Sequence, residues 1–70
     1  DDPDAGIVIE LKYVKSFNEM EQACQKALTQ IHERHYQEYL LNDNRKDIRL
    51  YGIAFCKKRC KAMTEVLPVK

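Results

Sequence analysis

Polar and apolar residues alternate along the first predicted strand of the chain. Residues 6–14 are rich in apolar and β-branched side chains and follow turn-forming residues, which is typical of a strand. Successive side chains of a strand point to opposite faces. One face therefore carries the apolar or aromatic residues Ile7, Ile9, Leu11 and Tyr13. The other face carries Val8 and the two charged residues Glu10 and Lys12. We expect Glu10 and Lys12 to lie roughly 6.5–7 Å apart on one face of the strand. The other residues of this strand predict that it is buried.

A long helix is predicted to follow this strand. Ser16 and Glu19 match a capping box, and apolar residues then recur at a spacing of three and four residues. The stripe consists of Phe17, Met20, Cys24, Ala27, Leu28, Ile31 and His35. Because no Gly or Pro interrupts the segment, we expect one continuous helix to about Leu40. We expect His35 to border the core and His32 to face solvent, and residues 42–44 to form a turn.

Two more strands complete the predicted order β-α-β-β, which makes the fold class α/β. They cover about residues 48–56 and 60–67, with a basic turn of Lys57, Lys58 and Arg59 between them and Pro68 at the end. The crossover predicts a small mixed sheet with one long helix packed on it. One sheet face and one strand edge would then be uncovered. Either more structure precedes Asp1–Ala5, which we interpret as a polar turn, or the chain associates with itself.

Composition narrows the classes of function. The chain is 44% hydrophobic and 33% charged, as expected for a globular protein, and its net charge of +1 gives no global signal for nucleic acid or membrane surfaces. No apolar run is long enough to span a bilayer, and no signal peptide is recognisable. Three cysteines without a C-x-x-C pair are interpreted as reduced thiols of a cytoplasmic protein.

The pair Glu10 and Lys12 is the main candidate for chemistry. A carboxylate can hold a hard metal ion, and a neighbouring ammonium group can polarise the attacking water. The alternative is that Glu10 and Lys12 have no role in chemistry and simply lie on the solvent-exposed face of an amphipathic strand. The segment His32-Glu33-Arg34-His35 falls one residue short of H-E-x-x-H, so a zinc site is disfavoured.

The residues around this pair resemble a known family. Ile-Glu-Leu-Lys at the end of a strand, a capped helix with Ala27-Leu28-x-Gln30-Ile31 and Tyr36, and then Tyr-Gly-Ile-Ala-Phe are similar to the PD-(D/E)XK nuclease superfamily. The resemblance runs from Gly6 to about Val66. It is strongest to the branch found C-terminal to an AAA-ATPase-like domain in bacterial proteins. It implies a partial restriction-endonuclease-like core and Mg²⁺-dependent phosphodiester hydrolysis of nucleic acid.

The resemblance also implies roles for individual residues. Glu10 would be a metal ligand for Mg²⁺ or Mn²⁺, Lys12 would activate water, and Gln30 would face the site. Tyr36 follows at the spacing of a residue near the substrate backbone. The basic turn of Lys57, Lys58 and Arg59 is a candidate nucleic-acid contact, although a hairpin turn can also be basic only because it is solvated.

One departure from the family pattern limits these expectations. The family's metal-binding Asp lies on the preceding strand, whereas Asp4 is too close to Glu10 and is interpreted as a turn residue. Residues 1–70 are therefore expected to be the C-terminal fragment of one nuclease-like domain, inactive and metal-free alone. The alternative is an interaction or regulatory module that has lost catalysis and is attached to an ATPase-like domain.

Overall fold

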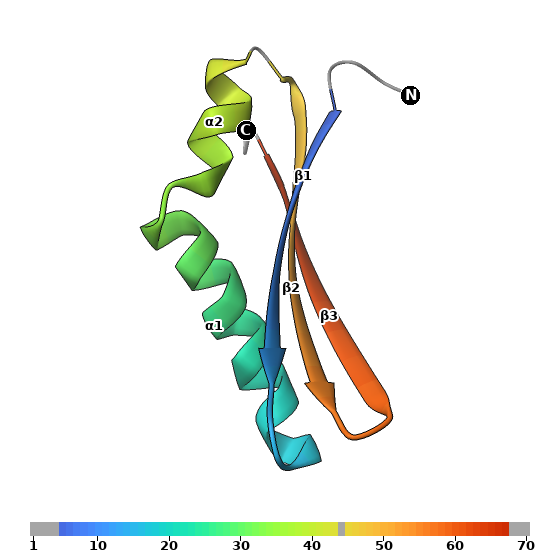
Figure 1. Cartoon of the computed structure of the whole chain (residues 1–70). Coiled ribbons are helices and arrows are strands. Elements are labelled where there is room, and N and C mark those ends of the chain that lie inside the picture. Colours follow the sequence, from blue (N-terminus) through green and yellow to red (C-terminus); the bar gives the residue numbers. More distant parts are fainter. Residues whose placement is uncertain (1–4, 44, 68–70) are drawn as a thin grey trace.

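The computed structural model describes residues 5–43 and 45–67 and confirms the predicted α/β architecture. The elements are β1 (Ala5–Tyr13), η1 (Phe17–Glu19), α1 (Met20–Glu33), α2 (Tyr36–Asn42), β2 (Asp47–Cys56) and β3 (Arg59–Leu67). Strand order is β1-β2-β3, with β1 parallel to β2 and β3 antiparallel to it (Figure 1). The turn at the start of the chain, Asp4, Asn44 and Pro68 lie outside the described residues.

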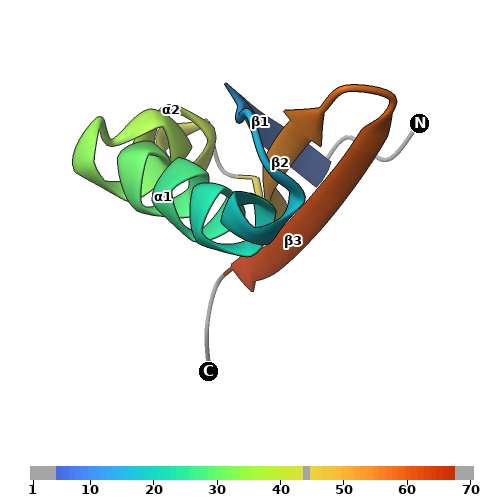
Figure 2. The same ribbon diagram turned by 90° about the horizontal axis from the view of Figure 1, so that it is seen from below.

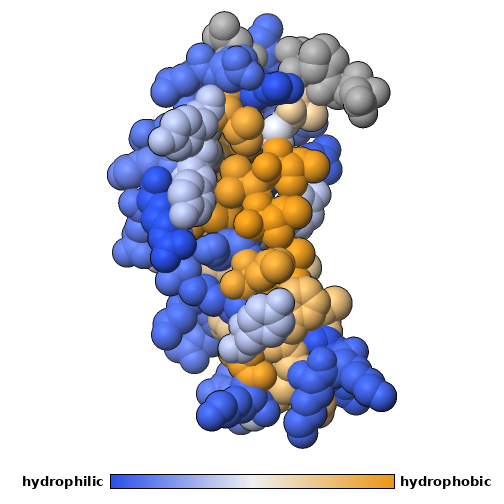
Figure 3. All heavy atoms as spheres, in the orientation of Figure 1, coloured by the Kyte–Doolittle hydropathy of each residue, from blue (hydrophilic) through white to orange (hydrophobic). Residues whose placement is uncertain are grey.

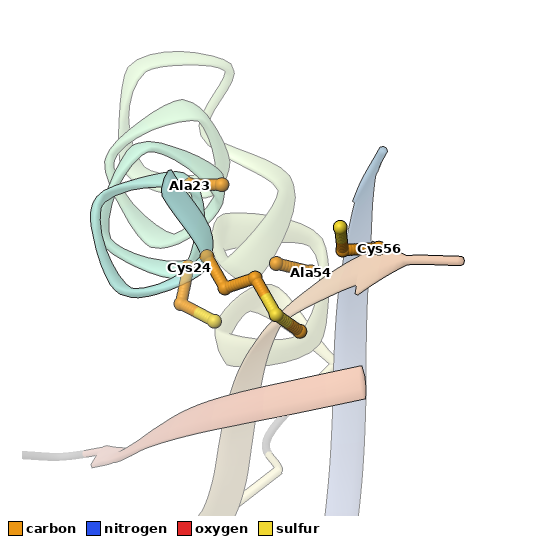
Figure 4. Packing of buried hydrophobic residues seen from close by; sticks show 5 residues of the cluster. Ala23, Cys24, Ala54 and Cys56 are labelled. Atoms are coloured by element: carbon orange, nitrogen blue, oxygen red, sulfur yellow. The ribbon is translucent and has the colours of Figure 1, made fainter. Parts of the chain in front are cut away.

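Both helices lie on the same face of the sheet, as the view from below shows (Figure 2). Most of the predicted apolar stripe forms the core: Met20, Cys24, Ala27 and Ile31 are buried, together with Ala23. Phe17 was also predicted to belong to this stripe but is 45% exposed. The buried residues of α1 face the buried side chains of β2, which are Ile48, Leu50, Ala54 and Cys56. Ala23 and Cys24 of α1 lie opposite Ala54 and Cys56 of β2 at one end of this core (Figure 4).

Gly52 of β2 allows the helix to approach the sheet closely. A Cβ atom at this position would lie 2.3 Å from the carbonyl oxygen of Cys24 and 3.1 Å from the Cβ of Ala27. Such a contact with backbone cannot be relieved by rotating a side chain. A residue without a side chain is therefore required where α1 crosses the middle strand.

The helical segment begins at the predicted capping box. The Ser16 backbone N–H donates to the Glu19 carboxylate at 3.1 Å, and the Ser16 hydroxyl donates to the same oxygen at 3.0 Å. These two hydrogen bonds from Ser16 lower the pKa of Glu19, because they favour the charged carboxylate. The first turn after the cap is the 3₁₀ turn η1, and α1 continues from Met20.

The prediction of one continuous helix to Leu40 is wrong. The helix ends at Glu33, and His35 adopts a left-handed conformation with φ 57° before α2 begins. This break turns α2 back toward the sheet, where Leu40 packs on the cluster of Ile31, Ile48 and Leu50. The apolar contact of Leu40 therefore outweighs the intrinsic preference for a straight helix.

The two histidines at this break are also placed opposite to expectation. The side chain of His35 is 65% exposed and pairs with Glu38, whereas His32 is half-buried and contacts Glu65 of β3. The break explains the exposure of His35, because residues after Glu33 no longer continue the buried stripe of α1.

The second face of the sheet is uncovered in the described part of the chain. The apolar face of β1 lies there, and Ile7, Ile9, Leu11 and Tyr13 are all exposed. Apolar side chains form a stripe along the strands beside the hydrophilic surface of the helices (Figure 3). The prediction of one uncovered sheet face is therefore confirmed for the described residues.

Candidate active site

Glu10 and Lys12 lie on the face of β1 that is covered by α1. The alternation of β1 places Gly6, Val8, Glu10 and Lys12 toward the helix. Glu10 is only 17% exposed at its side chain, and Lys12 is half-buried. Because β1 is an edge strand, this pair lies at the rim of the layer between helix and sheet, where a ligand can reach it.

Each of the two charged residues contacts one residue of the helical segment. Lys12 Nζ donates to Gln30 Oε1 at 2.5 Å, and Arg34 Nη1 donates to Glu10 Oε1 at 3.2 Å. Residues two apart on a strand are separated by about 6.5–7 Å, and residues four apart on a helix by about 6 Å. These similar spacings allow both contacts to form at once. We call the set Glu10, Lys12, Gln30 and Arg34 the paired cluster.

An open groove of about 660 Å³ begins at the contact between Lys12 and Gln30. It continues along α1 toward the end of β1, and its lining includes Lys26, Thr29 and Glu33. Two lysines and several amide or hydroxyl groups make this groove suitable for an anionic or polar ligand.

Tyr36 lies beside the paired cluster through its contact with Arg34. Arg34 Nη1 donates to the Tyr36 hydroxyl at 3.4 Å, and the guanidinium carbon is 6.0 Å from the centre of the tyrosine ring. The contact with Tyr36, with smaller contributions from Glu10 and Glu33, raises the pKa of Arg34. Arg34 therefore remains a cation at every physiological pH.

The basic turn forms a separate group around Phe17. Lys57 and Arg59 lie over the Phe17 ring, with Nζ at 5.6 Å and Cζ at 4.5 Å from its centre, and Lys58 is exposed. This arrangement provides cationic groups on an aromatic platform. No hydrogen bond or ion pair joins these three residues to the paired cluster among residues 5–43 and 45–67, and their role as nucleic-acid ligands stays a prediction.

The described residues do not by themselves provide the ligands of a metal site. Within the part of the chain that the structure describes, no three His, Cys, Asp or Glu side chains are grouped to hold a metal ion. Glu10 offers the carboxylate oxygen that Mg²⁺ prefers, but a hard divalent cation requires about six oxygen ligands. The oxygen donor of Glu10 is of the type that Mg²⁺ binds, but the described residues provide too few such donors. Glu10 is therefore at most one ligand of such a site.

Arg34 is the member of the paired cluster that sequence reasoning missed. Its position in the sequence predicts no role in the site, and its contact with Glu10 joins residues 24 positions apart. A signal was nevertheless present, because Gln30 and Arg34 are separated by four residues and share one helix face. Two strand residues at spacing two, opposite two helix residues at spacing four, form a recognisable pattern.

A small mixed sheet with a helix on one face, and an acid–lysine pair on its edge strand, is consistent with part of a restriction-endonuclease-like core. The family model described as "PD-(D/E)XK nuclease superfamily" matches residues 1–65, and the chain belongs to that superfamily. Its members are nuclease-type enzymes and commonly use divalent metal ions. The comparisons with curated proteins and with solved structures found no match. Among the described helices, none has the length and apolar character needed to cross a membrane.

Proposed function

We propose that this chain carries the Glu-x-Lys part of a nuclease active site and that the intact domain hydrolyses phosphodiester bonds of nucleic acid. The observation that carries this proposal is the contact between Lys12 and Gln30. It fixes the ammonium group of Lys12 on the face of β1 that also carries Glu10. Membership of the superfamily supports the reaction class.

Lys12 would act on the attacking water. An ammonium group stabilises negative charge that develops on a nucleophilic oxygen and donates a hydrogen bond to it. The Gln30 carbonyl oxygen accepts a hydrogen bond from Lys12 and thereby restricts the position of the flexible lysine. Gln30 is therefore proposed as a positioning residue for Lys12.

Mg²⁺ or Mn²⁺ dependence is part of the same proposal. Glu10 would supply one oxygen ligand, and an Asp outside the described residues would supply another, so that residues 1–70 are one piece of a larger nuclease-like domain. The metal, when bound, would neutralise charge on the phosphate that is attacked. Lys57, Lys58 and Arg59, around Phe17, and Tyr36 would contact the nucleic-acid backbone away from the reacting bond.

The decisive assay is metal-dependent cleavage of single- and double-stranded DNA and RNA by the full-length protein that contains these residues. We expect cleavage in Mg²⁺ or Mn²⁺, a loss of about 10²–10⁴-fold in Lys12→Ala, and a loss of about 10–100-fold in Gln30→Ala. Lys46→Ala is the control, because Lys46 is exposed and immediately precedes β2 at the other end of the sheet. The 70-residue chain alone should show no cleavage.

A second candidate is an interaction module without catalysis, attached to an ATPase-like domain in the bacterial cytoplasm. Two observations favour it: Arg34 already neutralises Glu10, and the apolar residues Ile7, Ile9 and Leu11 are exposed. That face, or the edge of β1, would then bind the neighbouring domain or a second copy of the chain. Absence of cleavage by the full-length protein on every substrate would favour this candidate.

A further inference from the structure

We propose that Arg34 is a ligand for a backbone phosphate of the nucleic acid, and that Glu10 holds this guanidinium in place until the phosphate replaces the carboxylate. The inference rests on the proposed function and adds a substrate-binding residue to it. Glu10 would then have two partners at different stages: Arg34 in the unliganded protein and other cationic groups of the site once the nucleic acid is bound.

The burial of the two partners differs in the direction that this exchange requires. The side chain of Glu10 is 17% exposed and is fixed on β1, whereas that of Arg34 is 51% exposed. Arg34 is also the C-cap residue that directly follows α1, which ends at Glu33. Arg34 can therefore turn toward a ligand in solvent while Glu10 stays under the helix.

The chemistry of Arg34 suits a phosphate. A guanidinium group is a planar fork of N–H donors that matches the oxygens of carboxylates and phosphates equally well. In the structure, a single nitrogen, Nη1, makes both the contact with Glu10 and the contact with the Tyr36 hydroxyl. The carboxylate of Glu10 thus occupies the position that a phosphate oxygen would take.

The position of Arg34 along α1 supports a backbone phosphate rather than a small anion. Lys26, Gln30 and Arg34 follow one another at intervals of four residues and so lie on one face of the helical segment. The first two line the groove that begins at Lys12. A chain of phosphates that enters this groove would pass Lys26 and Lys12 and meet Arg34 beyond Gln30.

A purely structural role would make the pair a minor contributor to folding. An ion pair with one half-exposed partner adds little to stability, because solvent screens it and because the long arginine side chain loses entropy. Phosphate binding and structural support therefore predict different results when binding and folding are measured separately.

The test is nucleic-acid binding by the full-length protein in EDTA, where no metal-dependent cleavage can occur. Fluorescence anisotropy with a short labelled DNA duplex, and with the RNA duplex of the same sequence, is recorded over a series of salt concentrations. The variants are Arg34→Ala, Arg34→Lys, Glu10→Gln and the double variant Glu10→Gln with Arg34→Ala. Circular dichroism checks that each variant is folded.

Arg49→Ala is the matched control. Arg49 is 53% exposed and pairs with a carboxylate, Asp47, at 3.5 Å, so it resembles Arg34 in exposure and partner. It lies on the opposite face of the sheet, however, since it alternates with the buried residues Ile48 and Leu50. Arg34→Ala and Arg49→Ala thus each remove one arginine charge, and they differ in where on the protein that charge is lost.

We expect Arg34→Ala to reduce the slope of log affinity against log salt by about 0.9, the value of one lost phosphate contact on a DNA duplex. Arg34→Lys should restore the slope, and Arg49→Ala should leave it unchanged. Glu10→Gln should bind about twofold to fivefold more tightly because Arg34 is released. This gain should disappear when Arg34 is alanine, whereas a general effect of removing one negative charge would persist.

The possible failures are distinguishable. If the protein cleaves nucleic acid but Arg34→Ala has the same salt slope as Arg49→Ala, the inference is wrong and the proposed function stands. If Arg34→Ala loses one phosphate contact in a protein that never cleaves, the inference stands and the proposed catalysis is wrong. If neither duplex binds at any salt concentration, the inference is wrong, and the cleavage assay decides the proposed function separately.

Discussion

The two faces of β1 carry side chains in the opposite arrangement to that expected for a strand covered by a helix. The face beneath α1 carries Glu10 and Lys12, while the uncovered face carries Ile7, Ile9 and Leu11. A strand shaped only by the needs of this small core would place its apolar side chains under the helix. The polar residues must therefore have a reason other than core stability, and the proposed nuclease site gives one.

The uncovered face leads to a different conclusion. Tyr13 stacks on Phe55 there with ring centres 5.4 Å apart, and Val66 of β3 is exposed on the same side. Contiguous exposed apolar residues of this kind mark surfaces that bind other protein. We therefore propose that the covered face serves the chemistry of the domain and that the uncovered face serves association.

The largest expected effect is on the core beneath α1. Ile31 is fully buried, so Ile31→Ala should lower the free energy of unfolding by about 3–4 kcal/mol through lost burial and the cavity that remains. In a domain of this size such a loss is enough to unfold much of the protein. Urea unfolding followed by circular dichroism measures it.

Ile9→Ala is the matched change on the uncovered face. Ile9 is 55% exposed, so we expect a loss below about 1 kcal/mol. Equal losses in the two variants would show that the uncovered face is buried in solution, for example in a dimer, and sedimentation would then reveal that state.

The second prediction concerns the contact between helix and sheet. Gly52→Ala should destabilise the protein by about 2–3 kcal/mol, because the new Cβ meets the backbone carbonyl of Cys24. Gly6→Ala is the control: its Cβ would meet the Leu40 side chain at 2.7 Å, and the end of a leucine can rotate away. The melting temperature of Gly52→Ala should therefore be well below that of Gly6→Ala. The reverse order would contradict the packing of α1 on β2.

The smallest expected effect is the pH dependence of the cap that starts the helical layer. The hydrogen bonds from Ser16 lower the pKa of Glu19 in the folded state, so the charged carboxylate stabilises the fold. This contribution is complete above the unfolded-state pKa of about 4.3 and is lost as pH falls through the lower folded-state pKa. The difference in unfolding free energy between the wild type and Glu19→Gln should shrink over that interval. A difference independent of pH would argue against the charged cap.

Much of the fold could be predicted from local patterns. Alternation placed Glu10 and Lys12 on one face, the capping box located the start of the helical segment at Ser16, and the crossover required a mixed sheet. The break at Arg34 and His35 could not be predicted, because no Gly or Pro marks it. It depends on Leu40 reaching the core, which is a tertiary contact.

The candidate site was predictable to a similar extent. Glu10 and Lys12 followed from strand spacing, and Gln30 followed from the family resemblance. The contact of Arg34 with Glu10 requires the three-dimensional register of α1 against β1, which periodicity alone does not give. The contact of Lys57 and Arg59 with Phe17 was missed for the same reason, since it joins the hairpin to η1.

The most direct test of the central claim measures stability and cleavage together in Lys12→Met of the full-length protein. Methionine keeps the length of the side chain and removes the charge from a half-buried position. If Lys12 is retained for chemistry, the free energy of unfolding should stay within about 1 kcal/mol of the wild type or rise, while cleavage is lost. Cleavage that persists at the wild-type rate, or destabilisation large enough to explain its loss, would contradict the account.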